Sequence, residues 1–261
     1  MKIDHAAADW TPENCLAMAR LAELAYEDHA VIEVQCKQWG FEIVKRLEDS
    51  LTDTQGFIVS HPDYSVLAFR GTEPGKLRDW LIDATVDQRL MTDLGNVHGG
   101  FRKAYRSVHD QIIDLALLWG GKPLFITGHS LGGALATLAT YTLARPRAAR
   151  IWLYTFGSPR VMDKDAAAQF NHWFGGRSFR MVNNSDPVAR VPPRLSNYWH
   201  VDDAVVADAD GLWNRGTSWW VRMLERVKGN WQEWLEEHEL AITSDHKISE
   251  YVRVSELNVK A

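Results

Sequence analysis

Apolar residues form two kinds of pattern that alternate along the chain: short continuous runs, and positions that recur every three or four residues. Short continuous apolar runs are typical of strands buried on both faces of a parallel sheet, and they occur at 65–70, 124–127, 150–156 and 178–182. Elsewhere apolar positions recur every three or four residues, which predicts helices at 12–26, 30–39, 101–119, 131–145 and 163–173. Runs at 41–47 and 57–60 predict two further strands. The alternation predicts an α/β protein with a mostly parallel central sheet and helices on both faces.

The first two helices carry boundary signals of their own. Thr11 precedes Pro12 and Glu13, so the first helix begins with a hydroxyl N-cap, a proline at its first position and an acid in its first turn. Gly40 ends the second helix. Since no repeat or change in composition divides the chain, residues 1–261 are predicted to form a single domain.

Charge and cysteine content exclude several classes of protein. The net charge of −5 and the absence of a long basic run argue against nucleic acid as a partner. No apolar run reaches the ~18 residues that a transmembrane helix needs. Cys15 and Cys36 are too few for a disulfide framework, and we interpret them as buried or idle thiols. Because Asp4, His5 and Asp9 do not fit a signal peptide, a cytoplasmic location is the default, with secretion expected if a leader was removed.

Candidate chemistry is concentrated where the apolar run at 124–127 is followed by Gly-His-Ser-Leu-Gly and then by an Ala/Leu-rich helix. Strand, sharp turn and helix in this order predict a nucleophile elbow, in which a strained turn presents the hydroxyl of Ser130. Gly128 and Gly132 are required because a Cβ at either position would clash where strand and helix pack closely. The helix N-terminus would direct its N–H groups towards an anion formed on the substrate. The other interpretation is a glycine-rich structural turn.

A serine nucleophile needs a base within hydrogen-bond reach and an acid that orients the base. With this kind of sheet the order along the chain is Ser, Asp or Glu, then His. Asp186 follows the strand at 178–182 and is the predicted acid, although an aspartate in a turn before proline is also common. For the base we favour His246, in a loop before the last helix, over a buried His200 and a solvated His238.

Several segments together resemble one known family. The segments run in order from Phe69 to Tyr251, and they are 69–72, 97–101, 128–136, 154–161 and 186–193, with His246 before Tyr251. They resemble the class 3 lipases, the fungal-type triacylglycerol lipases of the α/β-hydrolase fold. The resemblance implies Ser130 as nucleophile, Asp186 as acid and His246 as base, and it places His200 outside the triad.

An oxyanion hole needs two preorganised donors. One is the backbone N–H of Leu131, next to the serine. For the second we favour Thr72, which follows a central strand and stands where the resembled family has a serine or threonine. The rival is the stretch 98–100, His-Gly-Gly, which mimics a loop of other esterases.

Two segments are interpreted as candidate covers of the site. Residues 73–80 occupy the lid position of the resembled family, but only Leu77 and Trp80 in them are apolar, which argues against strong interfacial activation. The Trp-rich segment at about 213–240 is predicted to be a helical insertion. It would either pack on the core by its tryptophan face, or serve as a cap over the acyl site or as a patch that touches lipid.

Acidic residues at 202–203 and 208–210 resemble an incomplete calcium loop, and we prefer a solvated acidic loop without metal. Together the motifs predict a serine hydrolase of carboxylic esters, in the first place a triacylglycerol lipase or esterase that works through an acyl-enzyme and needs no cofactor. Its expected partners are an ester or lipid substrate and, transiently, a lipid surface. Phospholipase A1, feruloyl esterase and acyltransferase activities fit the same triad, and a hydrolase-fold binding protein without turnover is the non-enzymatic alternative.

Overall fold

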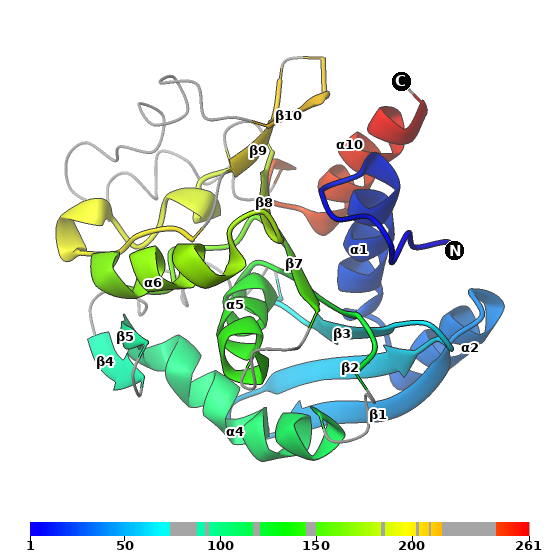
Figure 1. Ribbon diagram of the computed structural model, residues 1–261, viewed down its shortest axis with the longest axis horizontal. Helices are drawn as coiled ribbons and strands as arrows, with labels where there is room; N and C mark the ends of the chain where they lie inside the picture. The colour runs from blue at the N-terminus through cyan, green and yellow to red at the C-terminus, as the bar shows by residue number, and fades with distance from the viewer. Residues whose placement is uncertain are drawn as a thin grey trace.

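A computed structural model describes residues 1–73, 88–91, 94–116, 121–144, 150–183, 186–201, 204–208, 210–215 and 244–260. Its centre is an eight-stranded sheet in the order β1-β2-β3-β6-β7-β8-β9-β10 (Figure 1). Neighbouring strands from β3 to β9 run parallel, and the outer strands β1, β2 and β10 are antiparallel. The strands are β1 (Glu42–Asp49), β2 (Thr54–Ser60), β3 (Ser65–Phe69), β6 (Leu124–His129), β7 (Ile151–Phe156), β8 (Ser178–Val182), β9 (Ala204–Ala207) and β10 (Trp213–Arg215).

Helices cover both faces of this sheet, and each face has its own apolar core. Leu67 and Phe69 of β3 pack in one core together with α4, α5 and α6. Val66 and Ala68, which point to the opposite face, pack in the other core with α1, α2 and α10. The helices are α1 (Pro12–Leu24), α2 (His29–Gln38), α4 (Gly99–Ala116), α5 (Leu131–Leu143), α6 (Lys164–Phe174) and α10 (Ile248–Lys260). The predicted mostly parallel sheet with helices on both faces is thus confirmed.

The structure contains the boundary signals that the sequence predicts for the first two helices. The Thr11 hydroxyl accepts a hydrogen bond from the Asn14 N–H at 3.1 Å and caps α1. Gly40, two residues after α2, takes the left-handed φ of +86° that glycine tolerates. Asp163 is the N-cap of α6, and its side chain accepts the backbone N–H of Ala166 at 2.8 Å.

The first and last helices of the chain, α1 and α10, pack side by side (Figure 1). Cys15 of α1 lies in this interface, 3.5 Å from the hydroxyl of Ser255 in α10. Burial raises the pKa of Cys15 to about 12 and that of Cys36 to about 11, so both thiols stay protonated and unreactive. Both cysteines are free and buried, as the sequence predicts.

The last part of the sheet differs from the sequence prediction. β9 is too short for a clear pattern, and β10 begins at Trp213, which was assigned to the helical Trp-rich insertion. Trp213 pairs with Ala207 and its indole stacks on Tyr251, so tertiary packing decides its conformation. The structure also contains a hairpin of β4 (Gln88–Met91) and β5 (Gly95–His98), and two short 3-10 helices, η1 (Val188–Arg190) and η2 (Arg194–Ser196).

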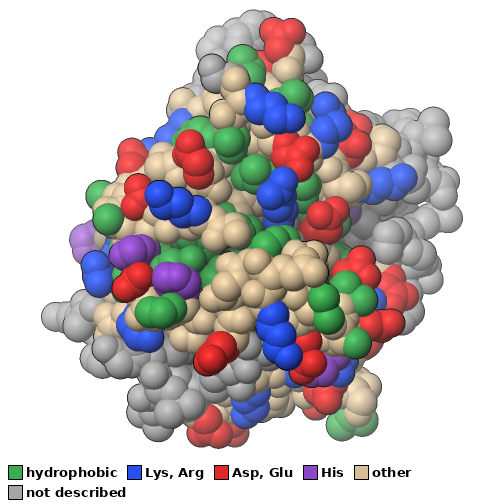
Figure 2. Space-filling view, turned by 90° about the vertical axis from the view of Figure 1, so that its right-hand side faces the viewer, with side chains coloured by type: hydrophobic (Ala, Val, Ile, Leu, Met, Phe, Trp, Pro, Cys, Tyr) green, Lys and Arg blue, Asp and Glu red, His purple; other side chains and the backbone are tan. Residues whose placement is uncertain are grey.

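Figure 2 shows the face on which α1, α2 and α10 lie, and on it charges of both signs are interspersed. Arg20 pairs with Glu256 at 2.8 Å, and Arg253 pairs with Glu250 at 2.8 Å. Charges of opposite sign are thus paired at these two places on that face. Among the residues that the structure describes, no helix is long and apolar enough to cross a bilayer.

Gly128 and Gly132 hold the junction between β6 and α5. A Cβ on Gly128 would lie 2.2 Å from the Gly132 carbonyl oxygen, and one on Gly132 would lie 2.4 Å from the Phe69 carbonyl oxygen. Both contacts are with backbone, which cannot rotate away. The predicted requirement for glycine at these positions is confirmed.

We predict that Gly132→Ala destabilises the protein by more than about 3 kcal/mol, because β3 must move away from α5 to admit the methyl group. Gly176→Ala is the matched control. Gly176 has a φ of +81° but open space around it, so only backbone strain of about 1 kcal/mol is expected. Urea unfolding of both variants measures the difference, and equal losses would show that the contact with β3 does not matter.

Candidate active site

Ser130 lies between β6 and α5 in a backbone conformation that side chains rarely adopt. Its φ is 56° and its ψ is −127°, and its backbone N–H donates to the Phe156 carbonyl oxygen at 3.0 Å. The residue is fully buried. A strained serine at the carboxyl end of a central strand is the geometry of a nucleophile elbow.

Asp186 and His246, the predicted acid and base, are in contact. Asp186 lies beyond the end of β8, His246 lies in the loop before α10, and Nδ1 of His246 donates to Oδ2 of Asp186 at 2.8 Å. Both side chains are almost completely buried. Since a carboxylate can only accept, the neutral ring has its proton on Nδ1 and its lone pair on Nε2.

The pair lies next to the elbow. Gly157 follows β7, the strand between β6 and β8, and a Cβ on it would lie 2.5 Å from Oδ2 of Asp186 and 2.8 Å from Nδ1 of His246. The ring of His246 also packs on His129, the residue before Ser130, with 4.4 Å between the ring centroids. The structure therefore brings the three predicted side chains to one edge of the sheet.

Two reactive atoms at this edge are buried and without a hydrogen-bond partner among the described residues: Oγ of Ser130 and Nε2 of His246. A hydroxyl and a basic nitrogen in this state can exchange a proton when a substrate approaches. Hydrogen bonds of this kind are often long before substrate binds and shorten in the complex.

Asp186 has further partners that sequence reasoning did not assign. The hydroxyl of Tyr251 donates to Oδ2 at 2.5 Å, and the backbone N–H of Val188 donates to Oδ1 at 2.8 Å. Burial, reinforced by the charge of Asp186, raises the pKa of Tyr251 well above its usual value, so its hydroxyl remains a donor. The only sequence signal for this contact is Tyr251 itself, which belongs to the segments of the resembled family.

The predicted oxyanion donors border a pocket of about 190 Å³ beside Ser130. Oγ1 of Thr72 is buried and has no hydrogen-bond partner among the described residues. Gly71 packs against the serine, since a Cβ on it would lie 3.1 Å from the Cβ of Ser130. The pocket is lined by Thr52, Asp53, Arg70, Gly71, Thr72, Glu73 and Leu131.

The stretch 98–100, the rival for the second oxyanion donor, has a structural role at the start of α4. Nδ1 of His98 accepts the backbone N–H of Gly100 at 3.1 Å, and its ring packs on Phe101 with 4.3 Å between centroids. His98 thus caps the first turn of α4. This arrangement favours Thr72 over the stretch 98–100 as the second oxyanion donor.

Of the other two candidate histidines, the structure describes only His200, and its side chain is bonded outside the site. Nε2 of His200, which is partly buried, donates to the Ala189 carbonyl oxygen at 2.6 Å, and this bond is a structural one. His238 lies outside the described residues, as do lid residues 74–80 and the Trp-rich segment from 216 onward.

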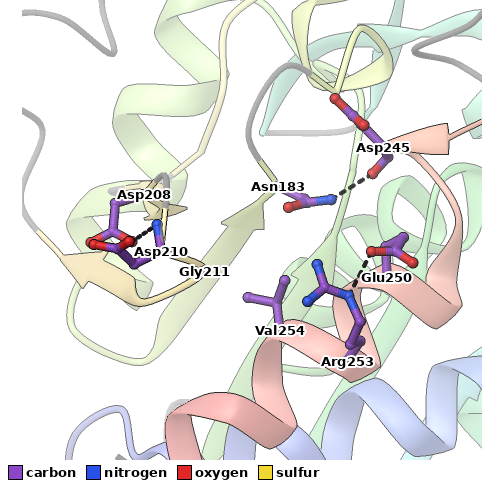
Figure 3. A pocket seen from close by; sticks show the side chains of 8 residues that line it. All are labelled: Asn183, Asp208, Asp210, Gly211, Asp245, Glu250, Arg253 and Val254. Carbon is purple, nitrogen blue, oxygen red and sulfur yellow. Dashed lines mark hydrogen bonds and ion pairs between the residues drawn. The ribbon is translucent and has the colours of Figure 1, made fainter.

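The predicted acidic loop contributes to a separate pocket, shown in Figure 3. Oδ1 of Asp208 accepts the backbone N–H groups of Asp210 and Leu212, and Oδ2 accepts the side-chain amide of Asn214. Across the pocket, Glu250 pairs with Arg253. The carboxylate of Asp208 therefore shapes its own loop, in the manner of an Asx turn.

Comparison with known proteins agrees with this geometry. The family model described as Lipase (class 3) matches residues 66–196, from β3 through the elbow and Asp186 to η2. The chain belongs to the class 3 lipase family. The predicted membership is thereby confirmed.

Individual relatives are fungal. The secreted mono- and diacylglycerol lipase A of Penicillium cyclopium is 35% identical over 165 residues, which are 59% of this chain and 52% of that protein. The secreted mono- and diacylglycerol lipase 1 of Fusarium solani is 36% identical over 154 residues, 56% of this chain and 45% of that protein. The chain thus spans about half the length of these two curated relatives.

A solved structure extends the comparison to most of the chain. The lipase from Rhizopus microsporus var. chinensis superposes with a TM-score of 0.70 and 24% identity, over 93% of this chain and 87% of that one. This likeness shows that the fold is the α/β-hydrolase fold of the fungal lipases, as the resemblance implies.

We predict that Thr72→Ala lowers kcat by about 10²-fold or more, because the hydroxyl would no longer donate to the oxyanion. Thr72→Ser keeps the hydroxyl and is the matched control, with a much smaller effect. Hydrolysis of a nitrophenyl ester measures both. An unchanged kcat in Thr72→Ala would leave the backbone N–H as the only donor of this loop.

A buried and a partly buried histidine, His129 and His200, predict acid sensitivity of the fold. Burial, and then the neighbouring His246, lowers the pKa of His129 well below its usual value. Burial, and then the positive charges of Arg180 and Arg160, does the same for His200. Unfolding returns each imidazole to a pKa of about 6.5, so the unfolded state binds more protons below that pH. Their contribution to stability is present above pH 6.5 and is lost as the pH falls towards the folded pKa.

The expected slope is up to about 1.4 kcal/mol per pH unit for each histidine. Urea unfolding between pH 5 and pH 8 measures it. His200→Gln keeps an amide donor for Ala189 and should show a shallower slope than the wild type. His172→Gln removes an exposed histidine of α6 and should leave the slope unchanged. Identical slopes for all three proteins would refute the assignment of His200.

Proposed function

We propose that the chain is a serine hydrolase of carboxylic esters that acts on acylglycerols and on short- to medium-chain esters. The observation that carries the proposal is the buried contact of His246 with Asp186 beside the strained Ser130. Such chemistry needs two atoms without hydrogen-bond partners in the fold. Nε2 of His246 and Oγ of Ser130 are in this state among the described residues. Membership of the class 3 lipase family supports the same activity.

In the proposed mechanism, Oγ of Ser130 attacks the ester carbonyl carbon while Nε2 of His246 takes the hydroxyl proton. Asp186 holds the imidazole in the Nδ1–H tautomer and stabilises its cation. The backbone N–H of Leu131 and the donors of Thr72 bind the oxyanion. The intermediate collapses, His246 gives its proton to the leaving alcohol, and the acyl group stays on Ser130.

The second half of the cycle repeats these roles with water. Nε2 of His246 removes a proton from water, whose oxygen attacks the acyl carbon, and the bond to Ser130 breaks as the serine regains its proton. The carboxylic acid leaves and the enzyme is restored. Protons and electron pairs balance at every step with this chain's own residues, so the proposed reaction uses no cofactor.

The substrate class rests on the relatives. The Penicillium and Fusarium proteins are named mono- and diacylglycerol lipases, which supports acylglycerols as substrates. Both are also named as secreted, which supports secretion of this chain over the cytoplasmic default. Transient contact with a lipid surface is part of the proposal, since acylglycerols with long chains are presented at such surfaces.

The test is a substrate panel combined with a serine probe. We predict that the protein hydrolyses nitrophenyl esters and acylglycerols and is labelled by a fluorophosphonate. Ser130→Ala should lose at least about 10³-fold in kcat and all labelling, because the nucleophile is gone.

The panel also includes mono-, di- and triacylglycerols, a phospholipid and a feruloyl ester. Turnover confined to the phospholipid or to the feruloyl ester would reassign the substrate. A folded wild-type protein that neither turns over any ester nor reacts with the probe would be a binding protein, and the proposed function would be wrong.

A further inference from the structure

His129 has both ring nitrogens engaged although it takes no part in the proposed proton transfers. Nε2 lies 2.6 Å from the backbone carbonyl oxygen of His246, and Nδ1 lies 2.8 Å from the hydroxyl oxygen of Tyr26. The side chain is buried at 5% exposure. A buried imidazole with two hydrogen-bond partners can position them, and one of these partners is the main chain of the predicted base.

The partners determine the tautomer of His129. A carbonyl oxygen can only accept, so the proton of the neutral ring is on Nε2 and is donated to His246. Nδ1 then carries the lone pair and accepts from the Tyr26 hydroxyl. Burial, opposed by the charge of Arg70, raises the pKa of Tyr26 above its usual range, so the phenol keeps the proton that it donates.

Tyr26 also touches the loop that carries the predicted oxyanion donor. A Cβ on Gly71 would lie 2.2 Å from the Tyr26 hydroxyl oxygen, so the backbone before Thr72 rests on this hydroxyl. The guanidinium of Arg70 lies 5.7 Å from the centroid of the Tyr26 ring, and it pairs with Glu73 at 2.7 Å. Tyr26 therefore contacts both the oxyanion loop and the support of the base.

The loop of His246 is held at two successive carbonyl groups. The side-chain amide of Asn183 donates to the Asp245 carbonyl oxygen at 3.0 Å, and His129 donates to that of His246. Two bonds to adjacent peptide groups restrict both the position and the rotation of this segment. Only the second of them depends on an imidazole whose tautomer another residue must set.

We propose that Tyr26 and His129 are positioning residues, which hold the main chain of His246 in register with Ser130. The proposal rests on the proposed esterase function, because it assigns a role within that site. Tyr26 acts through the tautomer of His129, and His129 acts through the backbone of His246. Neither residue is expected to touch the substrate.

The decisive comparison is between two amides at position 129. In His129→Gln the amide nitrogen reaches the place of Nε2 and still donates to the His246 carbonyl oxygen. In His129→Asn the amide reaches only the place of Nδ1, so the bond to His246 is lost. We predict that kcat for a nitrophenyl ester falls about 10-fold or more in the Asn variant, stays within roughly 3-fold in the Gln variant, and that KM changes little in either.

Tyr26→Phe supplies an independent arm of the test. In the wild-type background it frees the tautomer of His129 and should lower kcat by about 10-fold. In the His129→Gln background no tautomer remains to be set, so the same substitution should have little further effect. Tyr64→Phe, at another buried tyrosine at the far end of β3, is the matched control and should leave kcat unchanged.

The outcomes separate the two proposals. Equal kcat values for the Gln and Asn variants, or additive effects of Tyr26→Phe in both backgrounds, would reduce His129 to a packing residue and overturn the inference. Melting temperatures of the variants are measured as well. If His129 only packed, its substitution would change the melting temperature, and the Gln and Asn variants would have the same kcat. A wild-type protein that is not labelled by a fluorophosphonate would instead overturn the proposed function, and this inference with it.

Discussion

The strained backbone at Ser130 is the constraint on which the rest of the structure depends. A non-glycine residue with a φ of 56° costs about 1–3 kcal/mol, and such a conformation persists only where its surroundings leave no other. Here β6 is hydrogen-bonded to β3 and β7 on either side, and α5 lies so close to β3 that only glycine fits at position 132. The tight packing of small residues is therefore what holds the serine.

The order of strands explains how distant residues reach one place. Since β6, β7 and β8 are neighbours and parallel, their carboxyl ends bring Ser130, Gly157 and Asp186 to the same edge. His246 arrives by another route, because α10 packs on α1 and its Tyr251 binds Asp186. The first and last helices of the chain thus support a candidate site whose other parts come from the middle of the sheet.

What could be predicted from the sequence is what local chemistry decides. The elbow, its glycines, the Thr11 cap and the acid after β8 each depend on residues within a few positions, and all are found in the structure. The contact of Tyr26 with His129 joins residues 103 positions apart, and no pattern in either segment announces it. β10 shows the same limit. The conformation of Trp213 is decided by its contacts with Ala207 and Tyr251, and not by the helical spacing of the tryptophans in the Trp-rich segment.

Three buried polar atoms of the candidate site have no hydrogen-bond partner among the described residues. Leaving a buried donor or acceptor without a partner costs about 1–3 kcal/mol, so folded chains avoid it. Oγ of Ser130, Nε2 of His246 and Oγ1 of Thr72 are all in this state among the described residues, while Asp186 and His129 beside them are fully engaged. The bare atoms are those that an ester and its oxyanion would satisfy, and the engaged ones hold them in place. At these three atoms stability is given up for the proposed chemistry, and the engaged groups beside them keep them in place.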